Sequence, residues 1–336
     1  MEKVTRTSFL KRASRSQAFT LIILLAALIL LFTFLAMLND ANFFTRSTFI
    51  SILQDLAVPA FLAIGAGCLI VSGGIDLSQA AVGAMAGVIV SIGISWWHMP
   101  WFVAMIIALV AAGVIGLINA ALVNKLNMAP FIATMAMAAI IKAFMMLLCT
   151  DSKGVLQSVI NFDDPAINVI GTYSFGKIPA TVVLVVIAFI VYGMLLSKTQ
   201  LGKSIYMIGG NPMASRLSGI NAKKITYFLF VNCSMLGGLS GLIYTSRAKQ
   251  GSLLALMSDQ FTGMTAAILG GISFAGGSGG MGGAFVGLLV IKTFNKGMMI
   301  AGSSTYLTSV LSGALLLAAL TLDYMSQRRQ RKRVGA

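Results

Sequence analysis

The sequence predicts an all-α, polytopic membrane protein with about ten transmembrane helices and both termini in the cytoplasm. Of its 336 residues, 58% are hydrophobic and only 10% are charged, whereas about 25% of a typical soluble domain is charged. Apolar runs long enough to cross a bilayer recur along the chain, and basic residues gather in clusters between them. This composition excludes an ordinary soluble enzyme and a disordered protein, so most of the exterior faces lipid.

Ten apolar runs are the candidate helices. The first, 18–38, exceeds the ~7–15-residue core of a signal peptide, so we expect an uncleaved membrane helix. The others are 51–71, 80–97, 101–123, 129–149, 180–196, 225–245, 256–272, 283–302 and 305–325. Helices are expected throughout because backbone N–H and C=O groups in hydrocarbon must pair within their own segment.

The distribution of basic residues predicts the sidedness of the chain. With ten spans, the segments on the side of the termini hold 16 Lys and Arg, and those on the other side hold five. The positive-inside rule then places the basic segments 1–17 and 326–336 in the cytoplasm, flanking one transmembrane domain over 18–325. The longest cytoplasmic loop is 197–224. Because these charges flank apolar runs, the expected partner is membrane lipid and not nucleic acid.

No pattern in the sequence predicts catalysis. The single histidine, His98, excludes a two-histidine metal site, and the three cysteines are scattered through apolar runs. The stretch Ser197–Ser204 resembles a phosphate-binding loop but lacks its first glycine, which permits the tight turn around phosphate. We therefore expect a protein that is not an enzyme, with no metal or cofactor of its own; if ATP is used, another chain binds it.

The cytoplasmic loop contains a short amphipathic segment from Asn211 to Ile220. Asn211 followed by Pro212 is typical of a helix N-cap and first turn. Met213, Leu217 and Ile220 then share one apolar face, and Gly219 is expected to end or kink the helix. An apolar face in water needs a partner, so the segment either docks on another protein or lies on the membrane surface.

Polar residues inside the apolar runs are the other candidates for function. A charge at membrane depth costs roughly 2.5–3.5 kcal/mol, so Asp76 is expected either to cap a helix or to act as a gate. Asn119 and Asn295 are expected to bond between helices or to contact a substrate. Three lysines also fall within apolar runs: Lys142, Lys292 and Lys296. No nearby acid in the sequence supplies a partner for the last two.

Four motifs, in order, resemble those of sugar permeases of the ribose/xylose/arabinose class, the membrane subunits of bacterial ATP-binding-cassette (ABC) importers. They are Gly73–Ser78, Pro130–Thr134, Gly209–Ile220, and Gly270–Ser273 with Gly276, Gly277 and Gly279. The resemblance covers about residues 20–325. The first and last motifs also share the tripeptide Gly-Gly-Ile, a weak internal echo of the kind found in transporters built from two related halves.

The resemblance implies an importer in the bacterial inner membrane that carries a ribose- or xylose-like monosaccharide by alternating access. Its other parts would be a second permease subunit, identical or different, an ATPase subunit that binds ATP and Mg, and a periplasmic or extracellular sugar-binding protein. The residues implied in coupling to the ATPase are Asn211, Pro212, Met213, Ala214, Arg216, Leu217, Gly219 and Ile220. The candidate pathway or gate residues are Gly73, Gly74, Asp76, Asn119, Phe131, Gly270, Gly271 and Asn295.

The sequence also departs from this family. Gln79-Ala80 replaces a small hydrophobic residue and glycine, Ala129 replaces a proline, and 259–262 has one acid where the family tends to have more. These departures leave other cargoes open: a nucleoside, an autoinducer-type furanose or a branched-chain amino acid. A stand-alone secondary transporter is a further alternative, but the sequence has no glutamate after Glu2 to relay ions.

Overall fold

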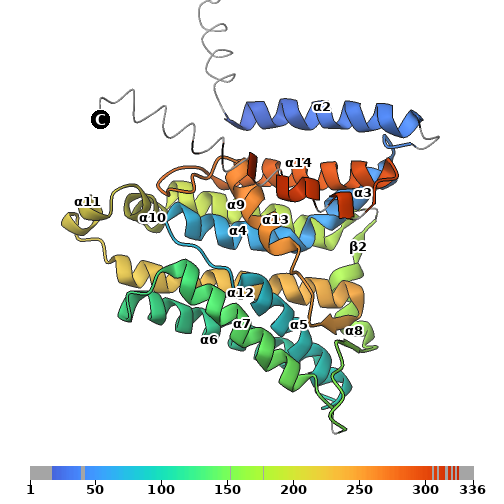
Figure 1. Cartoon of the computed structure of the whole chain (residues 1–336), viewed down its shortest axis with the longest axis horizontal. Coiled ribbons are helices and arrows are strands. Elements are labelled where there is room, and N and C mark those ends of the chain that lie inside the picture. Colours follow the sequence, from blue (N-terminus) through green and yellow to red (C-terminus); the bar gives the residue numbers. More distant parts are fainter. Residues whose placement is uncertain are drawn as a thin grey trace, which may run out of the picture.

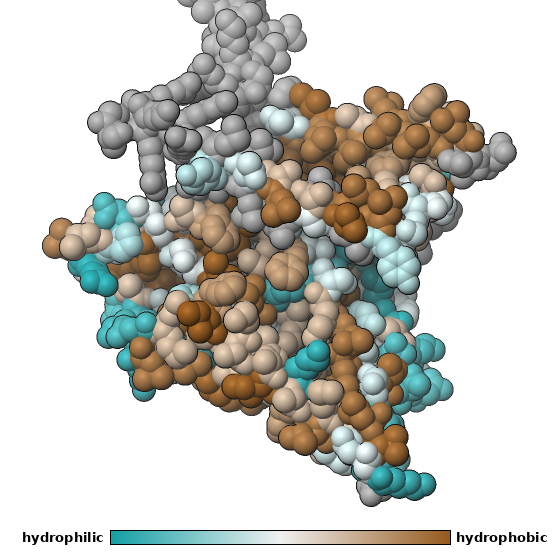
Figure 2. Space-filling model, in the orientation of Figure 1, coloured by the Kyte–Doolittle hydropathy of each residue, from teal (hydrophilic) through white to brown (hydrophobic). Residues whose placement is uncertain are grey.

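The computed structural model describes residues 17–38, 42–151, 153–176 and 178–304, together with 306–308, 310–314, 317–318, 321 and 324. This part of the chain is mostly helical, and its long helices run in roughly the same direction (Figure 1). Apolar side chains cover the middle of the face in Figure 2, while hydrophilic ones gather toward its two ends. This is the surface of a protein that crosses a membrane along its helices.

Six helices of the described residues are long and apolar enough to cross a membrane. They are α2 (Gln17–Leu38), α6 (Trp101–Lys125), α7 (Pro130–Leu148), α9 (Ala180–Lys198), α12 (Ala222–Ala248) and α14 (Met281–Ile300). A seventh span results if α3 (Arg46–Asp55) and α4 (Ala57–Val71), which meet at a 45° bend, are taken together. The chain is therefore a polytopic helical membrane protein, and the predicted last helix, 305–325, is described only in pieces, each of which is helical.

Two predicted spans are shorter than a full crossing. Helix α5 (Gln79–Ser95) has 17 residues, and α13 (Asp259–Leu269) has 11 where a run over 256–272 was predicted. At 1.5 Å per residue α13 is about 16 Å long, roughly half of the hydrocarbon core. It stops early because Gly271 turns into the left-handed region, with φ +95°. Hydropathy alone does not register this turn, since Ile272 continues the apolar run.

The ends of α4 and α13 have the same geometry. At α4, Gly73 has φ +84° and Gly74 N–H donates to the carbonyl of Leu69 at 3.0 Å. At α13, Gly271 adopts the left-handed backbone conformation, and Ile272 N–H donates to the carbonyl of Ala267, also at 3.0 Å. Both are glycine C-caps of the Schellman type. The Gly-Gly-Ile echo thus marks two equivalent helix ends, although the left-handed glycine is the first of its pair in one and the second in the other.

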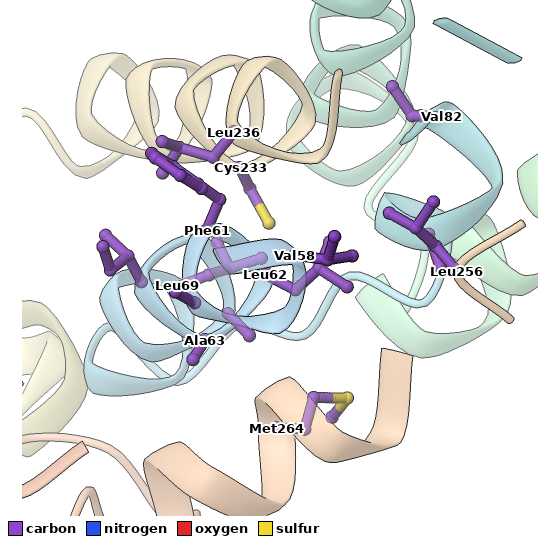
Figure 3. Close-up of a cluster of buried hydrophobic side chains, with 14 of the residues drawn as sticks. Val58, Phe61, Leu62, Ala63, Leu69, Val82, Cys233, Leu236, Leu256 and Met264 are labelled. Atoms are coloured by element: carbon purple, nitrogen blue, oxygen red, sulfur yellow. The ribbon is translucent and has the colours of Figure 1, made fainter. Parts of the chain in front are cut away.

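Helix α4 is the centre of the protein. All 15 of its residues are buried, and it packs mainly against α12 and α13, with α9 and α14 also in contact. Figure 3 shows Phe61 of α4 beside Cys233 and Leu236 of α12, with Met264 of α13 on another side of α4. Glycines of α5 and α12 also meet in this region, where a Cβ on Gly241 would overlap the backbone of Gly83. The core thus depends on close backbone approach as well as on apolar side chains.

Short strands join the segments that were predicted to lie outside the cell. Strand β1 (Val159–Asn161) pairs antiparallel with β4 (Gln250–Ser252), and β2 (Ser174–Phe175) pairs with β3 (Ile178–Pro179). The short helix α8 (Pro165–Thr172) lies between β1 and β2. The all-α prediction missed these strands because none exceeds three residues. The β1–β4 pair holds the loop after α7 against the loop after α12.

At the opposite end, helices α10 (Gln200–Gly210) and α11 (Pro212–Leu217) project from the helical body (Figure 1). Their junction with the body is made of glycine backbone, and we call it the glycine junction: Gly73, Gly209, Gly210, Gly276 and Gly277. A Cβ on Gly209 would overlap the Val71 carbonyl oxygen and lie 2.7 Å from the Gly277 nitrogen. In the same place, Gly277 N–H donates to that carbonyl at 2.8 Å. The loops after α4, α10 and α13 thus meet at one point.

Replacing Gly209 with alanine should therefore destabilise the protein by about 1–3 kcal/mol, because the added methyl group has to displace backbone. Gly282→Ala is the matched control, since nothing lies within 4 Å of its Cβ position. Thermal unfolding of the detergent-solubilised protein measures both. Equal melting temperatures for the two variants would contradict the close packing of this junction.

Candidate functional site

A buried polar cluster surrounds the link between α4 and α5. One carboxylate oxygen of Asp76, Oδ1, accepts hydrogen bonds from Ser78 N–H at 2.7 Å and from the Ser78 hydroxyl at 2.6 Å. The Asn119 amide on α6 donates to Ser78 Oγ at 2.8 Å, and Leu77 N–H donates to Thr134 Oγ1 on α7 at 3.0 Å. The start of α5 is thereby fixed to α6 and α7 through polar groups that are almost fully buried.

Gln260 completes this cluster and was missed in the sequence. Its carboxamide oxygen accepts from Ala80 N–H at 2.6 Å, and its nitrogen donates to the Asp76 carbonyl at 3.2 Å. The Gln260 side chain of α13 thus bonds both a backbone N–H in the first turn of α5 and a backbone carbonyl of the link before it. The only sequence signal was that 259–262 departs from the acidic pattern of the resembled family.

Asp76 stabilises the turn that leads into α5. Its Oδ1 accepts from the N–H of Ser78, as in an Asx turn, and Ser78 is the N-cap residue of the helix. Among the described residues, Asp76 Oδ2, Asn119 Oδ1 and both polar atoms of Gln79 are buried without a hydrogen-bond partner. Gly73, Gly74, Asp76 and Asn119 line neither of the two cavities described next. Gly270 and Gly271 form the turn after α13 and do not line them either.

An apolar groove of about 620 Å³ lies beside the cluster, between α7, α13 and the start of α5. Phe131, one of the predicted pathway residues, lines it together with Phe261 and Phe274. Gln260 and Lys142 are the hydrophilic residues in its lining. Lys142, whose role the sequence left open, therefore faces a groove between helices.

A second cavity, of about 450 Å³, is lined by charged side chains, and we call it the outer cavity. It lies where α3, α12, α13 and the C-terminal half of α14 come together. Lys292 Nζ lies 3.1 Å from Asp259 Oδ1, so the expectation that Lys292 lacks an acidic partner was wrong. The predicted residue Asn295 also lines this cavity, and its Oδ1 accepts from Ser312 Oγ at 3.2 Å.

The predicted coupling segment forms a short helix whose start was anticipated correctly. Asn211 Oδ1 accepts from Ala214 N–H at 3.0 Å, and Pro212 is the first helical residue. The helix ends at Leu217, so Ile220 lies beyond it and the predicted three-residue stripe is shorter than expected. The cause is the left-handed turn at Gly219, with φ +75°.

The exposed face of α11 is apolar and basic. Leu217 is 82% exposed and Met213 is 66% exposed. Arg216 lies between them in sequence and is also exposed. Among the described helices, α11 packs mainly against α10. Two large apolar side chains in water next to a cation form a surface suited to a protein partner.

Comparison with known proteins identifies the relatives of this fold. Residues 48–320 match the family model described as "Branched-chain amino acid transport system / permease component". The chain is 32% identical over 308 residues to the ribose import permease protein RbsC of Escherichia coli K12, covering 90% of this chain and 93% of that protein. It is 31% identical to the D-allose transport system permease protein AlsC of the same strain, covering 85% and 86%. For the L-arabinose transport system permease protein AraH the identity is 28%, covering 82% of each chain.

The turn that Asp76 forms with Ser78 leads to a prediction. Asp76→Asn keeps an oxygen that accepts from Ser78, so the yield and melting temperature of the protein should stay close to wild type. Asp76→Leu leaves that buried N–H unpaired and should cost about 1–3 kcal/mol. Both are measured by thermal unfolding in detergent, alongside substrate uptake. If Asp76→Asn abolished uptake at normal protein levels, Asp76 would be a gate instead.

Proposed function

Because this chain belongs to the family of ABC importer permeases, we propose that it carries a ribose- or xylose-like monosaccharide across the bacterial inner membrane by alternating access. The chain is a multi-pass, non-catalytic transport subunit. The proposal rests on one observation: its relatives are named for ribose, D-allose and L-arabinose, three aldoses, and align over 82–90% of this chain. All three sugars are small, neutral and polyhydroxylated.

The proposed topology has ten crossings, with both termini in the cytoplasm. Contacts between loops support it. The outer segments predicted from charge meet in the β1–β4 pair, and Ser95 at the end of α5 bonds Asn161 at 2.7 Å. The predicted inner segments meet at the glycine junction, and Asn124 donates to the Lys223 carbonyl at 3.2 Å. In this scheme α5 and α13 are too short to cross the membrane alone, and the extended link next to each helix completes its crossing.

The proposed assembly places α11 on an ATPase subunit. That subunit binds ATP and Mg, which this chain does not need to hold. The exposed Met213 and Leu217 dock on it, beside Arg216. Movement of α11 then reaches α10 and the glycine junction, and from there the links that follow α4 and α13. A second permease subunit and an external sugar-binding protein complete the importer.

The same contacts suggest how substrate would pass. Of the predicted pathway residues, Phe131 lines the apolar groove and Asn295 lines the outer cavity. The buried cluster around Asp76 and Gln260 holds the helix starts beside the groove. A shift at the glycine junction would therefore change the groove through the α4–α5 link and through α13, whose first turn carries Gln260.

Docking on the ATPase is tested at Leu217. Leu217→Gln removes an exposed apolar contact, so we expect co-purification of the ATPase to fall about tenfold and sugar uptake to fall with it. Leu254→Gln is the matched control, because Leu254 is also exposed, at 65%, but lies after α12 on the proposed outer side. Normal co-purification and uptake in both variants would show that α11 is a membrane-surface helix.

Topology is tested with single cysteines. The native cysteines Cys68, Cys149 and Cys233 are buried and are not expected to react. In intact spheroplasts an impermeant maleimide should label Leu254→Cys but not Ser218→Cys, and lysis should make Ser218→Cys reactive. Labelling of Ser218→Cys before lysis would refute the proposed sidedness. The same scheme applies to cysteines at positions 5 and 332.

A further inference from the structure

The outer cavity has an excess of positive charge. Its lining includes three cations, Arg247, Lys292 and Lys296, and two acids, Asp55 and Asp259. Arg247 lies 3.7 Å from Asp55 and also donates to the Gln54 carbonyl at 2.7 Å. Lys292 pairs with Asp259 at 3.1 Å. Lys296 makes no ion pair within the described part of the chain, so the cavity carries one uncompensated cation.

The position of Lys296 makes this excess costly. It follows Lys292 by one helical turn on α14, and like charges at this spacing repel each other. Both lysines line the cavity, and Lys292 is only 15% exposed at its side chain. A lysine among membrane helices is usually kept for a function. A negatively charged group inside the cavity would reduce the repulsion between Lys292 and Lys296 and would give Lys296 an ionic partner.

The rest of the lining suits a polyhydroxylated molecule. Asp55 and Asp259 accept hydrogen bonds from hydroxyl groups, and Asn295 both donates and accepts. Tyr244 contributes an aromatic ring. The volume of about 450 Å³ lies within the ~300–1,000 Å³ of small-molecule sites. The apolar groove offers only Gln260 and Lys142 as hydrophilic residues, so it is much less suited to hold hydroxyl groups.

We propose that the outer cavity binds the transported monosaccharide and that Lys296 selects one that carries a carboxylate, as in uronic and aldonic acids. This inference rests on the proposed function and narrows its substrate class. In this site Lys296 pairs with the carboxylate, while the Asp259–Lys292 pair and Asn295 contact the hydroxyl groups. Sequence reasoning noted Lys292 and Lys296 only as unusual residues of an apolar helix.

The test uses two sugars that differ at one carbon: D-galacturonate, with a carboxylate at C6, and D-galactose, with a hydroxymethyl group. Each is titrated calorimetrically into the permease–ATPase complex in nanodiscs at constant ionic strength, with acetate as a third ligand. We expect D-galacturonate to bind about tenfold more tightly than D-galactose or acetate. Lys296→Gln should remove this preference, and Lys296→Arg should keep it.

Lys249→Gln is the matched control. It removes one cation at the same end of the protein, but Lys249 is exposed and does not line the cavity. Any one of four results would overturn the inference. These are equal binding of the two sugars, binding of acetate as tight as that of D-galacturonate, binding of neither sugar, and a preference that survives Lys296→Gln. If the ATPase still co-purifies and a neutral aldose is still taken up, the proposed function stands, and only the restriction of the substrate to acidic monosaccharides fails.

Discussion

The structure depends on pairing the backbone of one non-helical link that is buried inside the protein around Asp76 and Ser78. Between α4 and α5 the chain leaves the helical hydrogen-bond pattern, and burial leaves its N–H and C=O groups there dependent on partners from the protein. Thr134, Asp76 and Gln260 supply the missing partners, from two other elements and from the link itself. Because these side chains come from α7 and α13 as well as from the link, the link also fixes how those helices sit around α4.

This arrangement connects the buried polar cluster to the end of the protein that carries α10 and α11. The link begins at Gly73, which belongs to the glycine junction, and it ends at the polar cluster. On the other side of α4, α13 begins with Asp259 and Gln260, which contact α14 and the link, and it ends at the turn leading to Gly276 and Gly277. The glycine junction and the buried polar cluster are therefore connected twice, once through the α4–α5 link and once through α13.

Local features of the fold were predictable from the sequence, and long-range ones were not. Asn211 and Pro212 specify a helix start by their own geometry, and apolar runs located most of the helices. The partner of Lys292 lies 33 residues away, and the bonds of Gln260 reach back 180 and 184 residues, so no local pattern marks them. The early end of α13 was missed because Gly271 adopts a left-handed conformation inside a run that stays apolar. Close approach at Gly209 was equally invisible, since its neighbour Gly277 comes from another loop.

The complete burial of α4 has a consequence for biogenesis. Its neighbours α12 and α13 are made much later; the bond from Ser240 Oγ to the Val58 carbonyl, for example, joins residues 182 positions apart. At about 5–20 residues per second, the ribosome needs roughly 10–40 s to cover that interval. During this time α4 stays in the bilayer without its final neighbours. The side chains of α4 must therefore be stable first against lipid and later against protein. This accounts for a central helix that is made entirely of apolar residues and is enclosed by other helices only after they have been synthesised.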